Sequence, residues 1–173
     1  MAETLEQLAR DIKHALRSHP GIEGRKMVCE RLSRTLLDEE FVARHLSARA
    51  PGAHPREVLY EDDELGFCIC GHVYDGAAHG KPHDHGSAWA IYGQATGETE
   101  MTDWKIVEKA SGDRPTLVEP EKVYTMKPGD AHLYDVGAVH SPSRSAPVRL
   151  IRIEGANLDR VTRSNIEAKE AVD

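Results

Sequence analysis

The 173-residue sequence has few cysteines, few aromatic residues and no excess of positive charge. Its three cysteines are an odd number, and Cys68 and Cys70 lie too close together in the sequence for a disulfide between them to stabilise the fold. We therefore expect a reduced, cytoplasmic protein. Lysine and arginine number 22 against 29 aspartates and glutamates, and this net charge of −7 argues against a broad nucleic-acid surface. No apolar run reaches about 18 residues and the first residues are charged, so we expect neither a membrane span nor a signal peptide. Histidine is what the sequence has in quantity, with ten residues in all.

Length and hydrophobic periodicity predict a helical part followed by a β-rich part. A chain of 173 residues that folds as one domain buries about two-thirds of its unfolded surface, so it needs no disulfide. Leu5, Leu8 and Ile12 recur at helical steps, and Pro20 ends the pattern. Two more helical patterns follow, at residues 28–36 and 38–46. We expect residues 1–50 to form a helical segment packed on the rest of the protein.

From Arg56 onward, short runs rich in β-branched and aromatic residues alternate with glycine and proline. Runs of this kind without helices between them predict an all-β barrel or sandwich. The predicted strands are residues 56–60, 66–74, 81–85, 88–94, 98–107, 122–126, 131–134 and 148–153. We expect residues 51–158 to form one barrel and the charged tail, residues 159–173, to be a helix or a frayed end.

The clearest chemical signal is the segment KPHDHG at residues 81–86. On a strand, residues two apart face the same way, with Cα atoms about 6.6 Å apart. The imidazoles of His83 and His85 can therefore bind one metal ion through bonds of about 2.1 Å. The alternative is that they are two partly exposed histidines in a polar turn.

The spacing around these histidines resembles the first motif of the cupin superfamily, G-x5-H-x-H-x3,4-E-x6-G. His83 and His85 match the two histidines of that motif, and Gly97 matches its last glycine. Ala90 stands where the motif has its glutamate. The resemblance implies an all-β core of the cupin type, a double-stranded β-helix, with the helical segment in front of it.

The second cupin motif, P-x-G-x2-H-x3-N, is similar to residues 135–144. His140 occupies the place of its histidine, and Arg144 replaces its asparagine. His132 is the rival position, although its surroundings lack one residue of the motif. The resemblance implies that His83, His85 and His140 bind one metal ion.

The missing glutamate leads to a finer resemblance. Three neutral imidazoles leave a divalent metal with its whole charge, which favours anionic bidentate ligands. A cupin site of three histidines and no acid is similar to that of cysteine dioxygenase and the related thiol dioxygenases, and acetylacetone-cleaving dioxygenases share it. The resemblance implies an enzyme that uses Fe(II), or alternatively Zn, Ni or Mn, and oxidises a small thiol carboxylic acid to a sulfinate with O2.

An upstream segment extends the likeness. The segment REVLYED at residues 56–62 is similar to the R-x-L-L-Y-x-D strand of thiol dioxygenases, whose arginine holds the substrate carboxylate. The resemblance implies this role for Arg56, because a guanidinium can bind a carboxylate through two parallel hydrogen bonds. The alternative is a solvated arginine at a strand edge.

The last strand departs from the family. Thiol dioxygenases carry a Ser-x-His-x-Tyr relay there, whose tyrosine reaches the iron site, and this sequence has Leu150, Arg152 and Glu154 instead. Arg152 and Glu154 form either an inward charged pair or an exposed cross-strand pair, and we expect the exposed pair. Strand alternation points Trp89 at the metal, whereas the cupin motif points Ala90 there, and the sequence leaves both open.

Other interpretations remain. One strand face carries Cys68, Cys70 and His72, and these residue types could bind zinc through sulfur and nitrogen. The commoner explanation is that they are small side chains buried in the core. A different metal-dependent cupin (a carbon–carbon-cleaving dioxygenase, a lyase or an isomerase) and a non-catalytic cupin that binds a small ligand are the alternative functions. We expect a small-molecule substrate and O2, no nucleic acid and no membrane partner, and barrel edges that allow a homodimer.

Overall fold

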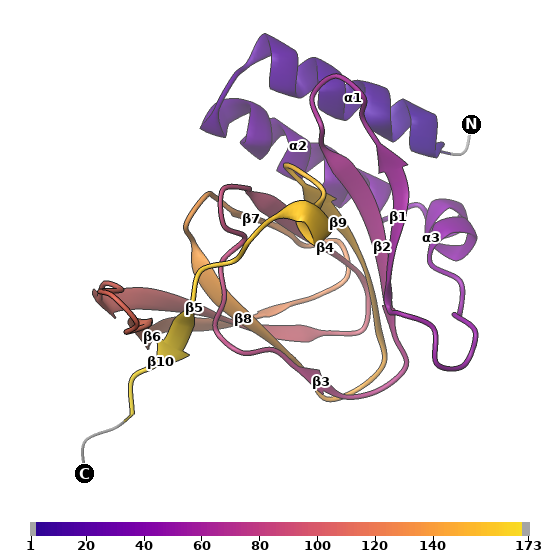
Figure 1. The fold of residues 1–173 in the computed structure, drawn as a ribbon. Helices are drawn as coiled ribbons and strands as arrows, with labels where there is room; N and C mark the ends of the chain where they lie inside the picture. The colour runs from indigo at the N-terminus through magenta and orange to yellow at the C-terminus, as the bar shows by residue number, and fades with distance from the viewer. Residues whose placement is uncertain (1–2, 171–173) are drawn as a thin grey trace.

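The computed structural model describes residues 3–170, in which three helices precede two β-sheets (Figure 1). Residues 1–2 of the expected helical segment and residues 171–173 of the expected tail lie outside this description. The helices are α1 (Leu5–Ser18), α2 (Ile22–Thr35) and α3 (Glu39–His45), and a short 3-10 helix spans Leu158–Arg160. The strands are β1 (Arg56–Glu61), β2 (Cys68–Tyr74), β3 (Ala78–His79), β4 (Ala90–Thr96), β5 (Thr99–Glu108), β6 (Thr116–Met126), β7 (Ala131–Tyr134), β8 (Val139–Arg144), β9 (Val148–Glu154) and β10 (Ile166–Ala168).

The three predicted helices are confirmed, and side chains cap two of them. The Thr4 hydroxyl accepts a hydrogen bond from the backbone N–H of Gln7 at the start of α1. The Asp38 carboxylate accepts one from the backbone N–H of Phe41 at the start of α3. Each cap satisfies an N–H that has no partner within its helix. Helix α1 ends before Pro20, as the periodicity predicts.

The strands form two five-stranded sheets, in the orders β1-β2-β9-β4-β7 and β10-β6-β5-β8-β3. Within the described residues, every neighbouring pair is antiparallel except β10 with β6. Each sheet pairs strands that are far apart in the chain, such as β2 with β9 and β5 with β8, and the sheets curl around a common interior (Figure 1). The predicted fold class, a cupin double-stranded β-helix with N-terminal helices, is therefore confirmed.

The first sheet has one face covered by helices and one face toward the barrel interior. Gly93 of β4 lies so close to α2 that an added Cβ would be 2.7 Å from the Leu32 and Leu36 side chains. Ile151 and Ile153 of β9 belong to the apolar cluster beneath the helices. The opposite face of these strands lines the interior, and this face carries the candidate site.

Several parts of the β region differ from the prediction, and one of them is β6, which begins at Thr116 and not at residue 122. Residues 81–85 are not a strand, because their backbone leaves the sheet after one bridge between His83 and His140. Strand β8 is missing from the predicted strands because it contains Pro142, and proline usually interrupts a strand. The proline is tolerated here because β8 has only the two-residue β3 as its neighbour on one side. Residues 159–170 are neither an α-helix nor a frayed end, since they run from the 3-10 helix into β10, which finds its partner in β6.

Candidate metal centre

His83, His85 and His140 come together in the barrel interior. One ring nitrogen from each lies within 4.8 Å of the other two. In the described part of the chain, no other group of three or more His, Cys, Asp or Glu side chains is arranged to hold a metal ion. His140 comes from β8, whereas the other two come from the loop between β3 and β4. The structure thus brings together the three histidines that the sequence singles out from two distant segments.

The backbone holds these rings close to one another. His83 and His140 exchange two N–H···O hydrogen bonds of 3.0 Å each. Gly86, next to His85, has a φ of +59°, and an added Cβ would lie 2.2 Å from the carbonyl oxygen of Thr162, so this turn requires glycine. The centroid of the His140 ring lies 4.6 Å from that of His83 and 4.7 Å from that of His85.

Burial keeps the three imidazoles neutral. Burial and, second, the positive charge of Arg152 lower the pKa of His85 to about 2. Burial and the two neighbouring histidines lower the pKa of His140 to about 2. Burial also lowers the pKa of His83. A neutral imidazole has a free nitrogen lone pair, which is the form that binds a metal.

Backbone carbonyls orient two of the rings. His83 Nδ1 lies 2.9 Å from the carbonyl oxygen of Lys81, and His140 Nδ1 lies 3.3 Å from that of Ala138. A ring that donates from Nδ1 presents Nε2 as its acceptor. Contacts of this kind are the usual support of metal-binding histidines.

Within the described residues, no carboxylate joins the three histidines. Ala90, at the position of the cupin glutamate, packs in the barrel interior, whereas Trp89 lies in the helix-side cluster. The alternative that the sequence left open is thereby resolved in favour of Ala90. The Asp84 carboxylate accepts hydrogen bonds from the backbone N–H of Gly86 and from the backbone and hydroxyl of Ser164. This acid therefore anchors the C-terminal segment and does not belong to the histidine cluster.

A tyrosine hydroxyl lies among the histidines. Tyr92 Oη is 3.2 Å from Nε2 of both His85 and His140, and it accepts a hydrogen bond of 3.3 Å from Arg152 Nη1. Tyr92 on β4 stands directly opposite Arg152 on β9. It is not among the predicted site residues, although it is two residues from Ala90 and therefore shares its strand face.

Arg152 and Glu154 form an inward, buried pair, so the predicted exposed pair is wrong. Their side chains are 10% and 0% exposed, and Arg152 Nε donates to Glu154 Oε1 at 2.8 Å. Helices cover the outer face of the sheet, so the polar residues of β9 face the interior. Burial raises the pKa of Glu154, but the hydrogen bond from Arg56 and the charge of Arg152 together hold it below its usual value.

Arg56 lines the interior cavity and already binds carboxylates of the protein. Its Nε and Nη2 donate to the two oxygens of Glu154 at 3.0 and 2.8 Å, and its Nη1 donates to Asp159 at 2.7 Å. The side chain is 9% exposed, so Arg56 is not a solvated arginine at a strand edge. Its role in holding a substrate carboxylate remains a prediction.

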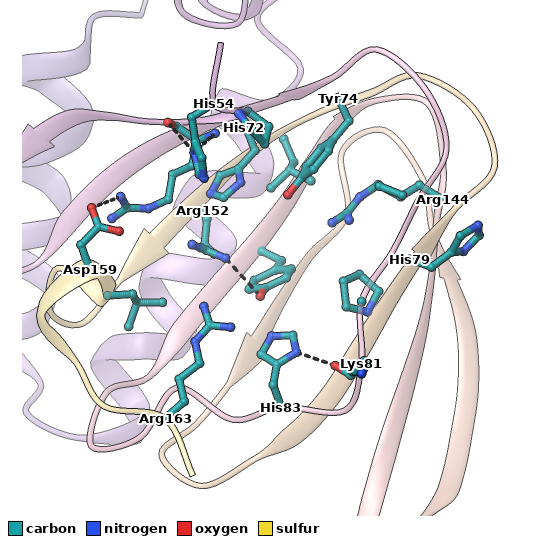
Figure 2. A pocket seen from close by; sticks show the side chains of 18 residues that line it. His54, His72, Tyr74, His79, Lys81, His83, Arg144, Arg152, Asp159 and Arg163 are labelled. Carbon is teal, nitrogen blue, oxygen red and sulfur yellow. Dashed lines mark hydrogen bonds and ion pairs between the residues drawn. The ribbon is translucent and has the colours of Figure 1, made fainter. Parts of the chain in front are cut away.

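A cavity of about 500 Å³ opens beside the histidines, and His83 lies on its wall (Figure 2). Positive side chains dominate its charged lining, and Asp159 is the only acidic residue among the lining residues. The positive residues are Arg56, Lys81, Arg144, Arg152 and Arg163. Because the whole chain carries a net charge of −7, this positive charge is a local feature. A concave site of this charge favours a small anionic ligand.

The three histidines fit a divalent transition metal. Nitrogens bound to one ion at about 2.1 Å in a tetrahedral site lie about 3.4 Å apart. The three ring nitrogens lie within 4.8 Å of one another, so shifts of about 1 Å in the rings bring them to this spacing. Imidazole donors suit Zn, Cu, Fe or Ni, whereas Mg and Ca prefer carboxylate and carbonyl oxygens. Three protein ligands also leave positions for a substrate.

The remaining candidates lie outside this cluster. Cys68 and Cys70 are free, buried thiols, and burial raises the pKa of Cys68 to about 11, so the thiolate that zinc binds is disfavoured. Together with His72 they form no metal-holding group within the described residues. His132, the rival third ligand, instead packs against Tyr134 in a tilted arrangement, with a centroid distance of 4.7 Å.

Comparison with solved structures yields similarities of fold. An uncharacterized conserved protein with a double-stranded beta-helix domain from Klebsiella pneumoniae is 16% identical, with a TM-score of 0.49 and coverage of 73% of this chain and 88% of that one. A cupin superfamily protein from Desulfitobacterium hafniense is 11% identical, with a TM-score of 0.47 and coverage of 67% and 88%. The DMSP lyase DddQ from Ruegeria pomeroyi is 14% identical, with a TM-score of 0.45 and coverage of 62% and 49%. No protein-family model and no curated protein sequence matches the chain.

The described residues contain no helix that is both long enough and apolar enough to span a membrane.

Proposed function

We propose that the protein is a mononuclear metal-dependent enzyme that oxidises a small thiol carboxylic acid to a sulfinate with O2, using Fe(II). The observation that supports this best is the cluster of three neutral imidazoles without a carboxylate, beside a positively charged cavity. The positive lining suits the carboxylate of the substrate. A metal ion that is held by three neutral ligands keeps its full positive charge, which suits the thiolate of the substrate.

In this reaction a thiol RSH and O2 give the sulfinic acid RSO2H. The O–O bond breaks, two S–O bonds form, and sulfur gives up four electrons to the two oxygen atoms. Bound Fe(II) supplies the redox centre at which thiolate and O2 react. His83, His85 and His140 would hold it, and the barrel interior limits the access of water.

Tyr92 has a position suited to proton handling in this site. Its hydroxyl lies between two of the histidines and receives a hydrogen bond from Arg152, which in turn is held by Glu154. A hydroxyl there can bond to the substrate sulfur or carboxylate. The relay that thiol dioxygenases carry on the last strand is thus replaced by a tyrosine from β4, oriented by a charged pair on β9.

The same tyrosine favours a second candidate function. A phenol beside a divalent metal can act as a general base and remove a proton from carbon next to a carboxylate. This step begins many lyase and isomerase reactions, for which Zn, Ni or Mn suffices. The two candidates differ in whether O2 is consumed.

Metal content tests the proposed ligands. Wild-type protein purified without a chelating tag should bind about one metal ion per chain. His140→Ala should lose most of it, with an affinity at least ~10-fold weaker, because the change removes a ligand. The fold should persist, since the apolar helix-side core does not involve His140. His132→Ala is the matched control and should keep its metal.

Full metal content in His140→Ala would disprove the proposed ligand set. Oxygen-electrode measurements on the iron-restored wild type, with a panel of thiols with and without a carboxylate, then test the reaction. Consumption of O2 with thiol acids supports the dioxygenase. No consumption with any thiol favours the lyase or isomerase, and a protein unable to take up Fe(II) favours a non-catalytic ligand-binding role.

A further inference from the structure

The positive residues that line the cavity differ in whether the protein neutralises them. Arg56 and Arg152 are both paired with Glu154. Lys81, Arg144 and Arg163 form no ion pair within the described residues. Lys81 and Arg163 are exposed, so water solvates their charges, whereas Arg144 is only 4% exposed. Arg144 is thus the cavity's buried cation without a counter-ion.

The contacts of Arg144 leave most of its hydrogen-bonding capacity unused. Its Cζ lies 4.4 Å from the centroid of the Tyr74 ring, so the guanidinium stacks on an aromatic face. Its Nε is buried and has no hydrogen-bond partner in the part of the chain that the structure describes. Burial lowers the pKa of Arg144, although a guanidinium stays charged at neutral pH. A buried charge of this kind destabilises a fold unless another group pairs with it.

The position of Arg144 allows one small ligand to contact both its guanidinium and the histidine cluster. It lies four residues from His140 on β8, on the same strand face, with a Cα separation of roughly 13 Å at ~3.3 Å per residue. Its guanidinium extends toward the middle of the cavity, where those of Arg152 and Arg163 also point (Figure 2). A short molecule can therefore contact Arg144 at one end and the histidine cluster at the other.

We propose that Arg144 binds the carboxylate of a small monocarboxylic substrate whose other end reaches His83, His85 and His140. This deepens the proposed function and rests on it. One unpaired buried guanidinium matches one negative charge, and its planar fork matches a carboxylate through two hydrogen bonds. The resemblance to thiol dioxygenases assigns this role to Arg56, but Glu154 already occupies the fork of that residue. Lys81 and Arg163 attract the anion to the cavity mouth.

Two probes that differ in one group test this assignment. Mercaptoacetate carries the carboxylate, and mercaptoacetamide has the same size without the charge. Calorimetric titration of the metal-loaded wild type should show a preference for the acid. Arg144→Gln should weaken binding of the acid about 10- to 100-fold and leave binding of the amide unchanged. Arg149→Gln, an arginine on β9 outside the cavity lining, is the matched control and should bind both probes as wild type does.

Stability measurements on metal-free protein separate this inference from the proposed function. Without a probe, Arg144→Gln should unfold at the same temperature as wild type or higher, because it removes an uncompensated buried charge. Mercaptoacetate should raise the unfolding temperature of metal-free wild type but not of Arg144→Gln, and Arg144→Lys should show a smaller rise. This result holds even if the chain takes up no metal.

An acid affinity in Arg144→Gln within twofold of wild type would overturn the assignment of Arg144. Equal stabilisation of both metal-free proteins by mercaptoacetate, or no preference of the wild type for the acid, would overturn it as well. Loss of metal binding alone would count against the proposed function and not against the carboxylate site.

Discussion

The two faces of strand β9 are both buried, yet they carry opposite chemistry. Ile151 and Ile153 point to the helices and belong to the apolar cluster beneath them. Arg152 and Glu154 point into the barrel interior and pair with each other there. One strand therefore separates a region stabilised by apolar packing from a region stabilised by charge balance and hydrogen bonds.

This difference indicates that the fold and the chemistry depend on different faces of one sheet. On the helix side, each Å² of buried apolar surface contributes roughly 25 cal/mol, with or without a ligand. In the interior, the buried Nε of Arg144 has no hydrogen-bond partner among the described residues, and His85 and His140 are buried as neutral groups. The packed helix side can maintain the structure while the interior keeps groups that a metal and a substrate would complete.

The largest expected effect comes from removing the negative charge of Glu154 on the interior face of β9. Glu154→Gln keeps the shape of the side chain but leaves Arg56 and Arg152 without their shared counter-charge. Because all three side chains are at least nine-tenths buried, we expect a loss of about 3–5 kcal/mol in the free energy of unfolding, measured in urea. Glu57→Gln, a half-exposed control, should cost less than ~1 kcal/mol. A loss below that level in Glu154→Gln would show that the interior does not depend on this charge balance.

The same carboxylate should make the stability of the protein fall in acid. The pKa of Glu154 is lower in the folded protein than the unfolded value of about 4.3. Its contribution is therefore fully present above that pH and is lost as the pH falls through the lowered folded-state value. Urea unfolding between about pH 6 and about pH 3 should show a smaller acid loss in Glu154→Gln than in wild type. Equal losses would assign the acid sensitivity to other carboxylates.

A cavity on the helix side should cost stability without changing the site. Ile151→Ala removes a fully buried side chain from the apolar cluster, so we expect a loss of about 2–4 kcal/mol. Metal content per folded chain should stay at the wild-type level, because Ile151 points away from the histidines. Loss of metal in protein that is still folded would mean that the two faces are coupled.

The smallest expected effect concerns the C-terminal segment that crosses the site. Ser164 Oγ donates to the Asp84 carboxylate at 2.6 Å, and Ser164→Ala removes this bond at a cost of about 1 kcal/mol. Hydrogen exchange should become faster across residues 161–168 and stay unchanged in β9. Ser145→Ala, an exposed serine, is the control. Unchanged exchange in Ser164→Ala would mean that β10 and the backbone hydrogen bond from Ser164 to Asp84 are sufficient to hold the segment.

Local patterns were sufficient for much of the fold. The helical steps of α1 and the bounds of β7, residues 131–134, agree with the structure. Strand β8 escaped prediction because Pro142 has no backbone N–H. Its carbonyl faces Gly80, from which it accepts a hydrogen bond of 2.8 Å, so the missing N–H falls on the side away from β5. Only the pairing of strands reveals that this proline is tolerated.

The sequence by itself determined the helices, most strands, and the histidine pair that lacks an accompanying acid, because these features depend on residue type and spacing along a short stretch of chain. Only the tertiary structure decided that Arg152 and Glu154 face inward, that Tyr92 reaches the histidines and that Arg144 is buried with no hydrogen-bond partner for its Nε among residues 3–170. Which side of a strand is covered depends on elements far away in the chain. Here the N-terminal helices cover the outer side of β9, so its polar residues face the interior.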